Sequence, residues 1–172
     1  MPSADYARTM AGYNLWQNGN LIEAADRLSD EDRKLDRGAF FGSIQQTFSH
    51  ILWGDQSWIS RFTGTEGPGG SIPDSVHHLA DWQAFKVERA RFDGVIRAWA
   101  LSVDPDWFDG DLTWYSGALG RNVSKPKKML TIQLFNHQTH HRGQIHAMLT
   151  AAGAKPDDTD VPFMPDRFLA DD

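Results

Sequence analysis

The segment over residues 127–152 constrains the fold of this chain more than any other part of its sequence. Apolar positions recur there every three or four residues, which is the spacing of one face of an α-helix and not of a β-strand. This stripe consists of Leu130, Leu134, His137, His141, Ile145 and Met148. A helix of this kind must bury its stripe against other elements, so two histidines are predicted to lie in the core of a helical protein.

The rest of the chain supplies three more helical patterns. Ser3 can cap the first, and Ser43 with Gln46 has the form of a capping box at the start of the second, which Gly64 can end. A largely aromatic stripe on the third consists of Trp82, Phe85, Arg89, Phe92, Ile96 and Trp99. The four predicted helices cover residues 3–28, 43–62, 79–101 and 127–152. We therefore predict an all-α fold, a four-helix bundle.

Shorter elements connect these helices. A polar run over residues 29–34 predicts a helical turn or a loop, and residues 111–123 predict a short β-hairpin between the third and fourth helices. The glycine- and proline-rich residues 67–73 form either a lid or a plain connector. The acidic tail over residues 155–172 is expected to wrap the surface or to fray. We expect residues 1–172 to make one domain.

The formal net charge of -6 narrows the range of partners. Negative charge without a basic stripe argues against nucleic acid. No apolar run approaches the roughly 20 residues that span a bilayer, so we expect no membrane association. The N-terminus lacks a secretion signal and the chain has no cysteine, which fits the cytoplasm. Without cysteine, any transition metal must be held by histidine, carboxylate and water.

His137 and His141 stand four residues apart, so on a helix they share one face and can bind a single metal ion. A buried imidazole without a hydrogen-bond partner costs about 1–3 kcal/mol. A shared divalent cation removes that penalty for both rings, and we therefore interpret the pair as metal ligands and not as ordinary core histidines. His140 lies on a flanking polar strip and His146 about half a turn away, so we place both outside the ligand set.

A third ligand must come from another helix, because metal sites with an open position usually take three protein groups. The candidates are His50, Asp55, His77 and His78. Periodicity does not favour His50, which lies opposite the apolar stripe of its helix. It shares a small-sided face with Gly54 and Ser57, and such a face suits either close helix packing or a cavity.

Three blocks of sequence carry a resemblance to a known family. They are Tyr13-Asn14-Leu15-Trp16-Gln17-Asn18, then Gly42-Ser43-Ile44 followed by His50-Ile51-Leu52-Trp53-Gly54-Asp55 with Trp58 and Arg61, and finally Asn136-His137 with His141-Arg142-Gly143-Gln144. Together they resemble the DinB family of bacterial proteins over nearly the whole chain. The resemblance implies a four-helix bundle with a divalent metal ion held by three histidines, which here are His50, His137 and His141.

The resemblance also implies an activity. Family relatives resemble thiol S-transferases, in which a low-molecular-weight thiol loses its proton and attacks an electrophile. Three neutral imidazoles leave a divalent ion its full charge and an open position, which suits such Lewis-acid chemistry. Zinc or nickel is the expected ion, with iron or manganese as alternatives. We therefore expect a metal-dependent transferase or hydrolase that acts on a small-molecule substrate.

The sequence assigns no separate catalytic residue. Asp55 is interpreted as an anchor for helix packing or as a group that orients a ligand. The pair Tyr13-Asn14 either lines a pocket or belongs to the core. Arg142 and Gln144 either hydrogen-bond neighbouring segments, with Gly143 allowing a close approach of helices, or touch a substrate.

Two alternatives without catalysis stay open. The metal can serve only to stabilise the bundle of a stress-related binding protein, in which case a fourth protein ligand closes its coordination shell. The chain can also be an interaction module that associates through exposed aromatic side chains such as Trp107 or Trp114. A homodimer is the expected assembly.

Overall fold

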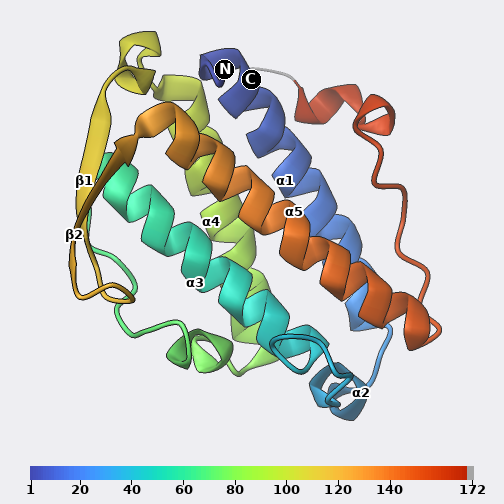
Figure 1. The fold of residues 1–172 in the computed structure, drawn as a ribbon. Helices are drawn as coiled ribbons and strands as arrows, with labels where there is room; N and C mark the ends of the chain where they lie inside the picture. The colour runs from blue at the N-terminus through green and yellow to red at the C-terminus, as the bar shows by residue number, and fades with distance from the viewer. Residues whose placement is uncertain (170–172) are drawn as a thin grey trace.

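Four long helices pack side by side in the computed structural model, which describes residues 1–169 (Figure 1). They are α1 (Ala4–Asp26), α3 (Ile44–Thr63), α4 (Trp82–Ser102) and α5 (Lys127–Ala151). Helix α1 packs on α4 and α5, and α3 packs on α5 and α4. The predicted all-α four-helix bundle is confirmed. Within the described residues, none of the helices has the length and apolar character that a membrane span needs.

Side-chain caps explain where these helices begin. The Ser3 Oγ accepts a hydrogen bond from the backbone N–H three residues on, at 3.3 Å, and the Ser43 Oγ does the same at 3.2 Å. Helix α4 begins at Trp82 and not near residue 79 as predicted, because the Asp81 carboxylate caps it through the N–H of Ala84 at 2.7 Å. Leu79 continues the apolar spacing of the stripe toward the N-terminus. The helix nevertheless starts only after Asp81, so Leu79 lies outside it.

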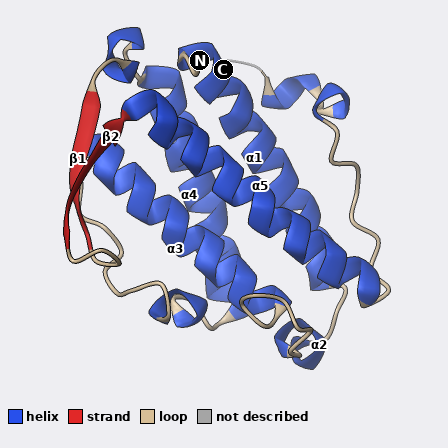
Figure 2. Cartoon of the chain, viewed as in Figure 1, coloured by secondary structure: helices blue, strands red, loops and turns tan. Residues whose placement is uncertain are grey.

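The predicted hairpin is also present, as β1 (Asp111–Ser116) paired antiparallel with β2 (Arg121–Pro126). Figure 2 shows it alongside the start of α5 at one edge of the bundle. Trp114 packs edge-to-face on Trp58 of α3, with ring centroids 5.6 Å apart. Trp107 is half-buried against the core as well. The two tryptophans are therefore half-buried and not exposed as the sequence suggested, whereas the homodimer itself stays a prediction.

A short helix and the C-terminal tail complete the fold around the four long helices. The polar run forms helix α2 (Asp30–Lys34), capped by Ser29. The tail lies along α1, where the Tyr13 hydroxyl donates to the backbone carbonyl of Thr159 at 2.7 Å and Met164 is buried. The tail therefore wraps the surface as far as residue 169, and residues 170–172 of the predicted tail lie outside the described part.

Gly12 lets the tail approach α1 closely. A Cβ at this position would lie 2.0 Å from the backbone oxygen of Phe168, whereas a Cβ at Gly19 in the same helix would meet nothing within 4 Å. We expect Gly12→Ala to release the tail and to accelerate its cleavage in limited proteolysis several-fold. Gly19→Ala is the matched control: it should leave cleavage unchanged and raise the free energy of unfolding by about 0.5–1 kcal/mol. Equal cleavage of both variants would contradict this role of Gly12.

Candidate metal centre

The packing of α3 on α5 brings His50, His137 and His141 together. One ring nitrogen from each lies within 4.8 Å of the others. The His50 and His137 Nε2 atoms are 3.0 Å apart although 87 residues separate them in sequence. Since metal–imidazole bonds are about 2.0–2.1 Å long, two nitrogens bound to one ion lie roughly 3 Å apart. The distance between His50 and His137 therefore fits one shared metal ion, and His141 lies close enough for the three to form a candidate metal site.

Gly54 explains how the two helices come close enough. A Cβ at this position would stand 2.9 Å from the Cε1 of His137, so only a residue without a side chain leaves room for the ring. Ser57, on the same face, lines a cavity. The small-sided face of α3 thus serves both purposes that its composition left open, close packing at one turn and a cavity at the next.

The surroundings of His50 fix the orientation of its ring. Its Nδ1 lies 2.7 Å from the Oγ of Ser75, and that hydroxyl donates its own proton to the carbonyl of Ile72 at 2.6 Å. Ser75 must therefore accept a hydrogen from His50 Nδ1, so Nε2 carries the lone pair of the ring and directs it to a position 3.0 Å from the Nε2 of His137. Phe41 stacks on the ring at a centroid distance of 3.8 Å. Support of this kind is typical of histidines that bind metal.

The two histidines of α5 differ in their hydrogen bonds. The Nδ1 of His141 lies 2.8 Å from the amide oxygen of Gln144 and donates to it, so its Nε2 carries the lone pair of the ring. Among the described residues, the buried Nδ1 of His137 has no hydrogen-bond partner. A buried ring nitrogen without a partner is unfavourable, and on the other side of the His137 ring its Nε2 stands 3.0 Å from the Nε2 of His50. This donor set fits a divalent metal ion.

The three imidazoles are in the form that metal ions require. Burial, followed by the proximity of the other rings, lowers the pKa of His50 to about 3 and that of His137 to about 4. Burial also lowers the pKa of His141. All three are therefore neutral at neutral pH, and a metal ion does not have to displace protons from them.

The other candidate ligands lie elsewhere. Asp55 is completely buried and forms an ion pair with Arg89 at 2.6 Å. It also accepts a hydrogen bond from Gln138 at 2.9 Å, so it ties α3 to both α4 and α5. Its interpretation as a packing anchor is correct. His78 bonds to a glutamine of α3 through its Nε2, and His77 is exposed.

A buried polar network links α1, α4 and α5, and the sequence predicted only part of it. Arg89 pairs with Asp93 at 2.7 Å, and the Nδ2 of Asn14 donates to the same carboxylate at 2.9 Å. Arg142 donates in turn to the Asn14 oxygen. Asn14 and Arg142 therefore support the packing of α1, α4 and α5. Neither lines the cavity beside the histidines, and the hydrogen bond of Arg142 to Asn14 fits the hydrogen-bonding alternative for Arg142.

Gly143 does not provide the close helix approach predicted for it. A Cβ there would meet nothing within 4 Å, and the close contact is made by Gly54 instead. We expect Gly54→Ala to displace the His137 ring and to weaken zinc binding about 10–100-fold, as loss of a supporting group does. Gly143→Ala is its control and should leave zinc affinity unchanged. Competition with a chromophoric chelator measures both, and equal affinities would contradict the role of Gly54.

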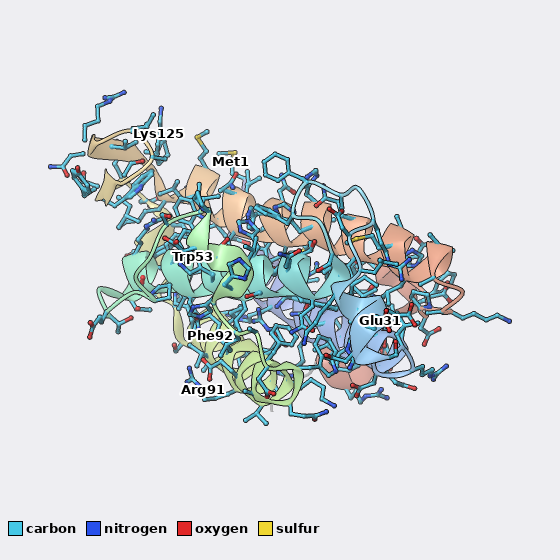
Figure 3. The ribbon with its side chains drawn as sticks, turned by 90° about the horizontal axis from the view of Figure 1, so that it is seen from below. Met1, Glu31, Trp53, Arg91, Phe92 and Lys125 are labelled. Atoms are coloured by element: carbon cyan, nitrogen blue, oxygen red, sulfur yellow. The ribbon has the colours of Figure 1, made fainter. Side chains whose placement is uncertain are left out.

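A cavity of about 520 Å³ opens beside His50 and His137. Its walls are the aromatic face of α3, the turn of the hairpin and the loop before residue 74. The Trp53 indole donates to the carbonyl of Gly69 at 2.6 Å and so holds this loop against α3. Figure 3 looks onto the side of the molecule where Trp53 lies, with Lys125 of the hairpin at one edge. The loop is thus a wall of the cavity and more than a plain connector.

The fold and the site together define the class of protein: a four-helix bundle with a candidate metal centre of three histidines beside a cavity. Residues 1–167 match the DinB family, and the chain belongs to that family. It is similar to the protein named Protein DinB of Bacillus subtilis (strain 168), with 24% identity over 159 residues that cover 91% of this chain and 92% of that protein. The family resemblance inferred from the three sequence blocks is confirmed.

Proposed function

We propose that His50, His137 and His141 hold one divalent metal ion, and that the protein is an enzyme that activates a thiol or a water molecule in the adjoining cavity. The observation that carries this proposal is the opening of the cavity onto two of the three histidines. Zinc or nickel is the proposed ion, with iron or manganese as alternatives. A thiol S-transferase is the favoured activity and a hydrolase the second.

In the proposed chemistry the metal ion and the protein side chains have different roles. A divalent ion bound to three neutral imidazoles supplies Lewis acidity, which lowers the pKa of a thiol or water that reaches it. Ser75 and Gln144 hold His50 and His141 in the tautomer that presents Nε2 to the centre. A substrate packed against the aromatic walls of the cavity would displace water from the reacting groups and so strengthen electrostatic effects there.

The number of ligands favours catalysis over a purely structural role. The group of metal-binding side chains contains three members within residues 1–169. Structural zinc sites usually have four protein ligands, whereas catalytic sites have three and keep one position for substrate. A stabilising metal in a non-catalytic protein is the alternative. It predicts a large loss of stability on chelation and no turnover.

Removal of the metal tests the activity. Small thiols such as cysteine would be mixed with the electrophile 1-chloro-2,4-dinitrobenzene, and the absorbance of the thioether product followed. We expect a rate above the background reaction with zinc- or nickel-loaded protein and only background with chelated protein. The metal-loaded His140→Ala variant, altered at an exposed neighbour of the centre, should keep the rate. Equal rates with loaded and chelated protein would contradict a metal-dependent transferase.

A further inference from the structure

The cavity beside the three histidines contains a cationic side chain, that of Arg61. Arg61 follows His50 on α3 by about three helical turns, or roughly 16 Å along the axis. Its guanidinium carbon lies 4.6 Å from the centroid of the Trp58 ring and 5.8 Å from that of Trp114. The two rings hold the flat cation in the cavity wall, at a distance from the metal centre.

This guanidinium lacks the partners that a half-buried arginine usually has. In the described part of the chain, no residue accepts a hydrogen bond from Arg61 or forms an ion pair with it. Arg89 differs, because it pairs with both Asp55 and Asp93. Burial lowers the pKa of Arg61, with no carboxylate to offset the lost hydration. Its five N–H donors are therefore available to an external acceptor.

The charge of the cavity points to the same conclusion. The chain as a whole carries a formal charge of -6, yet none of the described residues that line this cavity is Asp or Glu. Contacts with aromatic faces leave the N–H edges of a guanidinium free. Those edges match the two oxygens of a carboxylate in a bidentate arrangement. No carboxylate in the described lining would therefore oppose an anion that binds to Arg61.

We propose that Arg61 determines specificity by binding the carboxylate of an elongated organic acid, whose other end reaches the three histidines. The middle of such a substrate would be apolar, because Trp53, Trp58 and Trp114 are among the residues that line the cavity. A cavity of about 520 Å³ accommodates a molecule of this size. The inference rests on the proposed function, since the metal centre defines the reactive end.

Paired probes test the carboxylate site in the full-length protein. Octanoate and its neutral analogue octanamide would be titrated against zinc-loaded and chelated protein, with tryptophan fluorescence as the signal. We expect octanoate to bind about tenfold more tightly or better in both forms, as a hydrogen bond to a charged group provides. The chelated form is essential, because a carboxylate can also bind the metal directly.

Variants identify the residue responsible. Arg61→Met should abolish the preference for octanoate and keep the affinity for octanamide, which shows that the cavity is intact. Arg61→Lys should keep part of the preference. Arg91→Met, at an exposed arginine of α4, should keep all of it. Equal affinities of the two probes for the wild type, or an unchanged preference in Arg61→Met, would overturn the proposal.

A third probe separates this inference from the proposed function. The thiol 8-mercaptooctanoate should bind more tightly than octanoate only when zinc is present. If that gain is absent while chelated protein still prefers octanoate to octanamide, the role of the metal is wrong and the role of Arg61 stands. If the gain is present without a carboxylate preference, the assignment of Arg61 is wrong and the metal centre stands.

Discussion

Alanine in place of His50, His137 or His141 is expected to reduce bound zinc from one ion per chain to near zero after dialysis. Each substitution removes one of three nitrogens that converge within 4.8 Å. The loss of affinity should exceed about 100-fold, the upper end of what removal of a supporting group causes. Elemental analysis and competition with a chelator measure the metal content and the affinity.

Substitutions at two residues next to these histidines serve as controls, one with a smaller expected loss of zinc binding and one with none. Ser75→Ala removes the acceptor that orients His50, and it should weaken binding by about 10–100-fold. His140→Ala alters an exposed ring beside His141 and should keep full metal content. Circular dichroism verifies that each variant is folded. A variant of the three central histidines that retained one ion per chain would remove that residue from the site.

Replacement of Arg89 by methionine is expected to lower the free energy of unfolding by about 3–5 kcal/mol. The arginine is 1% exposed and pairs with the carboxylates of Asp55 and Asp93, both buried. Methionine fills most of the volume but leaves two buried carboxylates without their cation. Burial already raises the pKa of Asp93 to about 6, which shows how poorly this interior tolerates negative charge.

Arg91→Met is the matched control for this prediction. Arg91 lies on the same helix and pairs with Glu88 at 2.7 Å, but its side chain is 58% exposed. Exposed ion pairs contribute about 0–1 kcal/mol, so unfolding in urea should change little. A difference between the two variants of less than about 1 kcal/mol would mean that the buried network does not stabilise the bundle.

The helices were predictable from sequence because periodicity and caps are local signals. The stripe of α5 and the serine caps of α1 and α3 depend on residues within one or two turns. The error at the start of α4 has the same origin, since Leu79 continues the apolar spacing although the Asp81 cap lies after it. Local patterns thus predicted the existence of each helix more accurately than its first residue.

The third candidate ligand, His50, was not predictable from local signals. His50 lies on a polar, small-sided face, and only the family resemblance pointed to it. Its partner Ser75 lies 25 residues away in a short turn after a glycine- and proline-rich loop, and nothing in the spacing indicates the contact. The pairing of Asp55 with Arg89 across 34 residues was missed for the same reason. These contacts depend on how helices pack, which periodicity does not specify.

X-ray absorption at the zinc edge of metal-loaded protein tests the central claim most directly. With one zinc ion per chain, we predict scattering from three imidazoles with nitrogens at about 2.0–2.1 Å from the metal. His140→Ala should leave the spectrum unchanged, and His137→Ala should remove the signal or reduce the imidazole count. A wild-type spectrum with oxygen ligands alone, or with a single imidazole, would contradict a metal centre built from His50, His137 and His141.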